Sequence, residues 1–279
     1  MRPETPASAP SAEFEDHLAA RAVTCPMDTA LMAGFWGLVG GSALLIGAGI
    51  ASIAQLPQRL IAGVMAIGSG VLISAVAFDL MDEAYKRGGF AATAVGFLGG
   101  ALAYTAANVA VARAGAKHRK RSGSNPDQRQ PDANSGTGLA IAIGALLDGI
   151  PESVVIGVSL LAGGSVSFVT VIAVFLSNVP EGLSSAAGMK KAGRSAAYVF
   201  GVWTAIAVIS GIAALFGNLL LAGASAELIA LITSIAAGAI LAMLVDTMIP
   251  EATEMTHDYS GLIAVAGFLI AFVLSKLGG

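Results

Sequence analysis

Eight long apolar stretches constrain the fold of this chain more than any other feature. Each has 19–27 residues, and a helix needs about 20 to cross the hydrocarbon core of a bilayer. Charged residues make up only 12% of the 279 residues, too few to cover the surface of a soluble domain. The stretches are 29–54, 59–81, 90–113, 138–162, 166–189, 195–221, 225–249 and 259–277. They predict an all-α membrane protein with eight transmembrane helices.

The distribution of basic residues predicts the orientation. If the N-terminus is outside, ten of the 15 Lys and Arg residues fall in the inner connections. Basic loops stay on the cytoplasmic side of a membrane. The expected location is therefore the cell (plasma or inner) membrane, crossed several times, with both termini extracytoplasmic.

Two hydrophilic segments are expected to lie outside the membrane. Residues 1–28 are rich in Pro, Ala and Ser and lack the basic start of a signal peptide, so they are predicted to be a disordered tail. Residues 114–137 contain an HRKR cluster and are predicted to be a flexible cytoplasmic loop. The expected role of this loop is topology and contact with anionic lipids, because His118 stands alone and a metal sensor would need several histidines.

An internal repeat organises the helices. Residues 69–84 align without a gap with residues 237–252. Helices 1–3 (29–113) therefore resemble helices 6–8 (190–279), and two helices (138–189) lie between them. Because two helices lie between them, the second triplet enters the membrane from the opposite side. The prediction is therefore a 3+2+3 arrangement with inverted repeats, which places a substrate site near the bilayer midplane.

The two central stretches share a second repeated motif, LLDGIPES at 146–153 and FLSNVPEG at 175–182. Pro151 and Pro180 cannot donate a backbone hydrogen bond, so each frees a carbonyl and kinks its helix. Glu152 and Glu181 follow directly, near the middle of the membrane. An ionised carboxylate there costs about 2.5–3.5 kcal/mol even on the lenient insertion scale.

Further oxygen ligands precede the two glutamates. Asp148 lies one helical turn before Glu152, and Ser177 one turn before Glu181, so each pair shares a helix face. Asn178 can turn its amide oxygen toward the same seam. Converging carboxylates require positive charge, which a divalent cation supplies directly and which protons can also supply. The alternative is a purely structural role, with protonated acids tying kinked helices together.

At these residues the sequence resembles the ZIP (Zrt/Irt-like) metal-ion transporters, whose fourth and fifth helices carry His-Asn-x-Pro-Glu-Gly and a similar element. The resemblance implies eight helices and a metal site between helices 4 and 5, formed here by Asp148, Glu152, Ser177, Asn178 and Glu181. It also implies passage of zinc or a related ion into the cytoplasm. Asp148 stands where the family has histidine, and Gly149 where it has asparagine. The resulting all-oxygen set favours Mn²⁺, Fe²⁺ or Mg²⁺ relative to a zinc site that contains histidine.

The expected function is therefore transport of divalent cations, and the chain is not expected to be an enzyme. No cofactor is expected, since the metal is the cargo, and no ATP-binding loop occurs. The expected partners are the divalent cation and the lipid bilayer, with no nucleic acid; a homodimer is left open. The alternative is a transport-inactive member of the same fold that acts as a membrane scaffold or regulator. An organic cation as cargo is disfavoured because the site lacks aromatic faces.

A second set of acidic residues flanks the repeated segments. Asp79, Asp82 and Glu83 lie at one end, and Asp246, Glu251, Glu254, His257 and Asp258 at the other. These residues are expected to form either entrance and exit funnels for cations or ordinary solvated helix ends.

Overall fold

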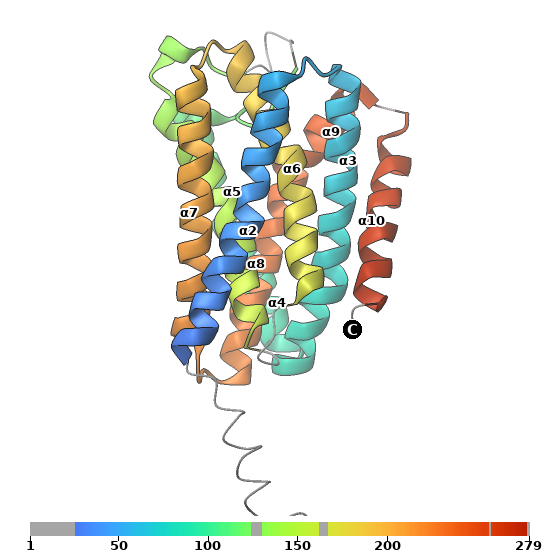
Figure 1. Cartoon of the computed structure of the whole chain (residues 1–279). Helices are drawn as coiled ribbons and strands as arrows, with labels where there is room; N and C mark the ends of the chain where they lie inside the picture. Colours follow the sequence, from blue (N-terminus) through green and yellow to red (C-terminus); the bar gives the residue numbers. More distant parts are fainter. Residues whose placement is uncertain (1–25, 124–129, 162–166, 257, 278–279) are drawn as a thin grey trace, which may run out of the picture.

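The computed structural model describes residues 26–123, 130–161, 167–256 and 258–277, and its regular elements in this part of the chain are all helical. The segment 1–25, most of the predicted tail, lies outside the described residues, whereas Pro26–Asp28 begin the first helix. The helices form one bundle, in which α2 begins and α10 ends at the same end (Figure 1). Their bounds are α2 Pro26–Ile53, α3 Gln58–Ala75, η1 Val76–Met81, α4 Asp82–Val111, η2 Ala112–Ala116, η3 Ala133–Ser135, α5 Gly138–Ser159, α6 Phe168–Lys191, α7 Ala196–Leu221, α8 Ala226–Met243, η4 Leu244–Met248, α9 Ile249–Thr256 and α10 Ser260–Leu277.

Within the described residues, seven helices are long and apolar enough to cross a membrane, not the eight expected. The difference lies in one 59-residue stretch, 58–116, which contains both predicted helices 59–81 and 90–113. A straight helix of that length would measure roughly 88 Å, about three times the hydrocarbon thickness. Gly89, with φ 69° and ψ −175°, interrupts the helical backbone and divides the stretch.

Local ion pairs explain why the first part of this stretch continues past its predicted end. Lys86 pairs with Asp82 at 2.6 Å, and Arg87 pairs with Glu83, both one turn apart. Such pairs stabilise a helix. The helical backbone therefore runs through the predicted loop until Gly89, whose missing side chain permits a positive φ.

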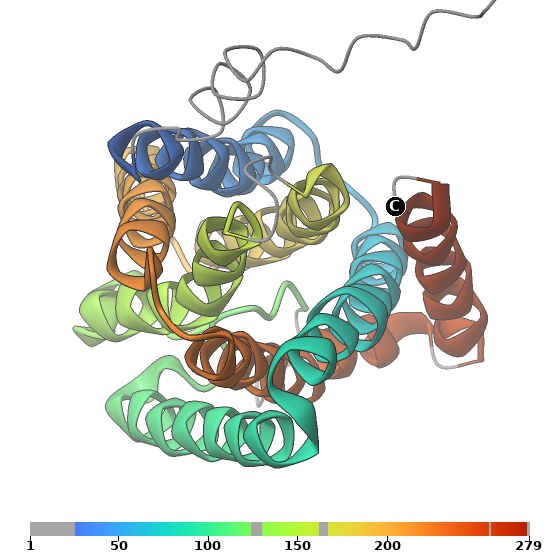
Figure 2. The ribbon, with the colours of Figure 1, turned by 90° about the horizontal axis from the view of Figure 1, so that it is seen from below.

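Helices that are distant in sequence pack closely. The principal pairs are α2 with α7, α3 with α10, and α4 with α8. Figure 2, which looks along the bundle from below, shows α5 near the middle of the bundle and α6 between α2 and α3, while α10 lies at the periphery beside α3. The helices α5 and α6 carry the two Pro-Glu motifs.

Glycines bring the backbones of these pairs together. A Cβ atom on Gly70 of α3 would lie 1.8 Å from the carbonyl oxygen of Ala264 in α10. A Cβ atom on Gly238 of α8 would lie 1.9 Å from the carbonyl oxygen of Phe97 in α4. Small residues at helix interfaces are a general means of close packing in membranes.

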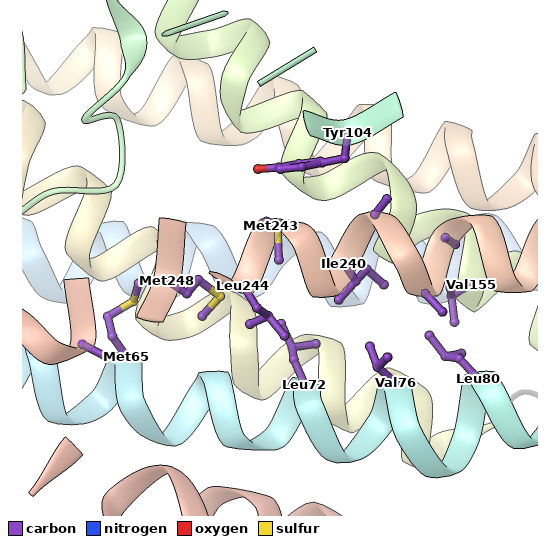
Figure 3. Packing of buried hydrophobic residues seen from close by; sticks show 14 of the residues in the cluster. Met65, Leu72, Val76, Leu80, Tyr104, Val155, Ile240, Met243, Leu244 and Met248 are labelled. Carbon is purple, nitrogen blue, oxygen red and sulfur yellow. The ribbon is translucent and has the colours of Figure 1, made fainter. Parts of the chain in front are cut away.

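The largest apolar cluster lies between the helices that carry the internal repeat. Side chains of α3 and η1 face those of α8 and η4, with Val155 of α5 completing the cluster (Figure 3). The labelled members are Met65, Leu72, Val76, Leu80, Tyr104, Val155, Ile240, Met243, Leu244 and Met248. The Tyr104 hydroxyl points away from this cluster toward the polar interior described below.

Candidate functional site

All five residues of the predicted metal site are buried. Asp148 and Glu152 lie on α5, and Ser177, Asn178 and Glu181 on α6, and none has an exposed fraction above 4%. Both helices continue through their prolines. The two motifs therefore place three carboxyl groups in the interior of the bundle.

Asp148 is held by basic and hydroxyl groups of the protein itself. Arg119 donates from Nε to Oδ2 at 3.0 Å and from Nη2 to Oδ1 at 2.8 Å. The Tyr104 hydroxyl donates to Oδ1 at 2.6 Å. Such a two-point contact between guanidinium and carboxylate is the strongest form of this ion pair.

Lys120 connects the two Pro-Glu helices. Its Nζ lies 3.0 Å from Oε2 of Glu181 and 3.4 Å from Oδ2 of Asp148. The Lys120 side chain is 3% exposed, so this ammonium group is a cation removed from water. Asp148 and Glu181 thus meet around one positive charge, and that charge belongs to the chain itself.

Glu152 differs from the other two acids. Both of its carboxyl oxygens are buried, and neither has a hydrogen-bond partner in the described part of the chain. Arg119 and Lys120 pair with Asp148 and Glu181, whereas no ion pair of Glu152 is found among the described residues. A buried carboxyl group without a partner is costly and marks a place where a ligand or proton is needed.

The two polar side chains before Glu181 bind backbone carbonyls. The Ser177 hydroxyl donates to the carbonyl of Val174 at 2.9 Å. The Asn178 amide donates to the carbonyl of Gly40 at 3.0 Å, which ties α6 to α2. Both residues keep oxygen lone pairs, but their observed contacts are structural.

A neighbouring polar cluster, not part of the predicted metal site, surrounds Glu251 of α9. Its Oε1 accepts hydrogen bonds from the backbone N–H of Ser122 at 2.9 Å and from the Ser184 hydroxyl at 2.9 Å. Arg121 donates to Glu254 at 2.8 Å and to the carbonyl of Pro250 at 3.0 Å. These contacts fasten residues 119–122 to α6 and α9.

The segment 119–122 lies in the connection predicted to be a flexible loop. In the structure, Arg119, Lys120 and Ser122 are buried. Gln130 donates to the carbonyls of Arg119 and Ser185, at 2.6 Å and 2.9 Å, so the far side of the connection is bound as well. The HRKR cluster was visible in the sequence, but basic loop residues are usually solvated. Only the unpaired acids of α5 and α6 indicated a need for cations.

Burial and neighbouring charges shift the pKa values of two residues in this connection, Arg119 and His118, in opposite directions. Burial disfavours the charged form of Arg119, but the adjacent Asp148 carboxylate outweighs this effect and raises the pKa of Arg119. Burial, together with the positive charges of Arg121 and Lys117, lowers the pKa of His118. Arg119 is therefore a permanent cation, whereas His118 is neutral at pH 7.

Two cavities are relevant to this site, one lined in part by α5 and α6 and the other lined in part by Lys120. The Asp79 cavity, about 360 Å³, is lined by Asp79, Val155, Ser159 and Thr170 among others. Val155 and Ser159 follow Glu152 on the same face of α5. The Lys120 cavity, about 310 Å³, is lined by Lys120, His118, Asn108 and Asp246 among others. One cavity thus adjoins the helix face of Glu152, and the other is lined in part by Lys120, whose ammonium group pairs with Asp148 and Glu181.

The flanking acidic residues have varied surroundings. Asp79 accepts a hydrogen bond from Ser275 at 2.6 Å, and Asp246 accepts one from Asn108 at 3.2 Å. Asp82 and Glu83 form the ion pairs within α4, and Asp258 is exposed. His257 lies outside the described residues. Asp79 and Asp246 line cavities, whereas Glu251 is buried and is not a solvated helix end.

No group of three or more His, Cys, Asp or Glu side chains in the described ranges is arranged to hold a metal ion. Asp148 and Glu181 instead pair with Lys120, and both Glu152 oxygens lack a hydrogen-bond partner among the described residues. A scan against family models gives no match, and a search of the curated proteins finds no relative. The fold and the apolar helices define a multi-span, all-helical membrane protein with a buried charge network.

Proposed function

We propose that this protein transports divalent cations across the membrane and that Asp148, Glu152 and Glu181 form the binding site for the ion. The observation that carries the proposal is the position of Lys120, whose ammonium group lies between carboxylates of two different helices. Oxygen atoms that hold one cation in the interior can hold another. A divalent ion that displaces Lys120 would also reach Glu152, which has no partner.

The arrangement of the helices supports a transporter architecture. The π-helical segments η1 and η4 occur at equivalent places in the repeated sequences 69–84 and 237–252. The close contacts of Gly70 and Gly238 are also equivalent in this alignment. These equivalent pairs favour two inverted triplets of helices around α5 and α6. In this arrangement the break at Gly89 separates two of eight membrane crossings. Inverted repeats of this kind are typical of transporters that work by alternating access.

The cargo follows from the ligand chemistry. Carboxylate and amide oxygens favour Mn²⁺, Fe²⁺ or Mg²⁺, whereas the motif resemblance to ZIP transporters favours Zn²⁺ and transport toward the cytoplasm. The ion would enter by the Asp79 cavity and leave by the Lys120 cavity. Residues 119–122 would move away from α5 and α6 during release.

Lys120→Met tests the proposal in proteoliposomes that contain a fluorescent indicator for divalent ions. Removal of the competing ammonium group should lower the half-saturating concentration of Mn²⁺ by about tenfold or more, which corresponds to about 1.4 kcal/mol. Glu152→Gln and Glu181→Gln should abolish uptake. Arg113→Met removes an exposed cation from the same connection and should leave uptake unchanged.

Thermal unfolding with and without Mn²⁺ or Zn²⁺ provides a second measurement, since a bound ion stabilises the folded state. Absence of flux and of stabilisation by either metal, in both the wild type and Lys120→Met, would contradict the transport proposal.

The second candidate function is a transport-inactive membrane scaffold or regulator. The observation that favours it is Arg119, which with Tyr104 already binds both oxygens of Asp148. In that case Glu152→Gln and Glu181→Gln should change neither metal binding nor flux, whereas loss of Arg119 should destabilise the fold.

A further inference from the structure

We propose that the protein has a binding site for an anionic phospholipid in the pocket between α2, α3 and α6. This α2–α6 pocket has a volume of about 520 Å³. Its residues are Ala51, Ala54, Gln55, Leu56, Pro57, Ile61, Leu183, Ala187, Lys190 and Lys191. The inference is independent of the proposed transport function.

The wall of the pocket is apolar. Ala51, Ile61 and Leu183 are buried residues at its interior, and Ala187 is partly exposed. A wall of this kind has no polar group to offer a soluble ligand, but it suits an acyl chain. Burial of methylene groups against such a wall is favourable, because it removes apolar surface from water.

The rim of the pocket is basic. Lys190 donates to the carbonyl of Ser52 at 3.1 Å, and Lys191 donates to Oε1 of Gln58 at 3.1 Å. Neither lysine has a carboxylate partner among the ion pairs of the described residues. Each ammonium group has three N–H donors, so both can also bind a phosphate oxygen at the end of α6.

The surroundings place the pocket at the boundary between hydrocarbon and headgroups. Ile53 is 90% exposed and Leu60 is 50% exposed, as expected for side chains that face lipid tails. Arg59, beside Leu60, is exposed and adds a third positive charge. An apolar wall below clustered lysines matches the two parts of an anionic phospholipid.

The pocket lies at the end of α2 opposite to Pro26, and the 28 residues of that helix span roughly 42 Å. Residues before Pro26 would have to cross the hydrocarbon core to reach it, so they are poor candidates to fill the pocket. A phospholipid, in contrast, is present at the site in every membrane. The charge of the rim selects an anionic headgroup over a zwitterionic one.

The test uses the full chain in nanodiscs with equal amounts of phosphatidylglycerol and phosphatidylcholine. Phospholipids that stay bound after transfer to detergent are counted by mass spectrometry. The wild type should retain phosphatidylglycerol preferentially. Lys190→Gln and Lys191→Gln should each lower this preference about fivefold, the factor that corresponds to about 1 kcal/mol per lysine near an anionic headgroup.

Two further variants separate a built site from general attraction to a charged membrane. Arg113→Gln combined with Lys117→Gln removes two exposed cations from the connection after α4, neither of which lines the α2–α6 pocket, and should leave the preference unchanged. Ala187→Phe fills the pocket and should lower retention of both lipids. Size-exclusion profiles and melting temperatures identify any variant that fails to fold.

Equal retention of the two lipids by the wild type overturns the proposal. An equal loss of preference in the Arg113–Lys117 variant and in the lysine variants of the pocket overturns it as well.

Discussion

The carboxylate of Asp148 contacts three side chains of the described residues. Arg119, in the segment after α4, and Tyr104, in α4, donate hydrogen bonds to it, and Lys120 pairs with both Asp148 and Glu181. Removing water from two charged groups costs free energy, so a buried ion pair is stable only if its own contacts offset that cost. A buried pair of this kind is consequently sensitive to loss of one member.

Arg119→Met should destabilise the protein by about 3–5 kcal/mol, because it leaves the buried Asp148 carboxylate without its two-point partner. Arg119→Met combined with Asp148→Asn should recover much of that loss, since no unpaired charge remains. Denaturant unfolding in detergent micelles gives both values as a double-mutant cycle. Additive losses in the two single variants would show that the pair is not coupled.

The lowered pKa of His118 predicts how the stability of the protein depends on pH. Its pKa is lower in the folded state than the ordinary value of 6.5, so the unfolded chain binds a proton at a higher pH than the folded one. The contribution of the neutral His118 to the free energy of unfolding is fully present above about pH 6.5. It is lost as the pH falls through the lowered pKa of the folded state. His118→Gln should therefore reduce the fall in melting temperature between pH 7.5 and pH 5.5. The expectation is wrong if both proteins lose the same number of degrees.

The positions of the helices can be predicted from hydropathy, but which helices pack against each other cannot. Six of the predicted stretches coincide within a few residues with apolar helices of the structure. Hydropathy reports which segments enter lipid and carries no information about neighbours, so the pairing of α3 with α10 and of α4 with α8 could not be derived from it. The glycines at these contacts were visible only as a high glycine content.

Gly100→Ala and Gly99→Ala form a matched pair on α4. A Cβ atom on Gly100 would lie 1.9 Å from the carbonyl oxygen of Ile235, whereas one on Gly99 meets nothing within 4 Å. Gly100→Ala should destabilise by about 1–3 kcal/mol through overpacking. Gly99→Ala should be neutral or stabilising by up to about 1 kcal/mol, because alanine favours a helix. Equal melting temperatures for the two variants would contradict the packing of α4 on α8.

For the molecule as a whole, composition was sufficient to predict an all-helical membrane protein. The motifs also predicted that Asp148 and Glu181 meet, because antiparallel neighbours bring the turns around Pro151 and Pro180 to a similar depth. The source of their positive charge was not predictable. Arg119 and Lys120 belong to a hydrophilic connection, and contacts of such a segment with helices 29–133 residues away depend on the complete fold.

The predicted orientation of the bundle can be tested with cysteines at the two ends of α7. Ala196→Cys and Ala222→Cys are exposed positions, and each is introduced together with Cys25→Ser. In intact cells, a membrane-impermeant maleimide should label residue 222 and should label residue 196 only after permeabilisation, because residue 196 lies at the basic end. The reverse pattern would place both termini in the cytoplasm.

The buried segment 119–122 also constrains the order of assembly. During synthesis, Arg119, Lys120 and Arg121 leave the ribosome before Glu181, Glu251 and Glu254 exist. These three cations therefore remain in water until α6 and α9 have been synthesised. Docking of this segment is then a late step of biogenesis, and a nascent chain truncated before Glu251 should leave the segment accessible to proteases.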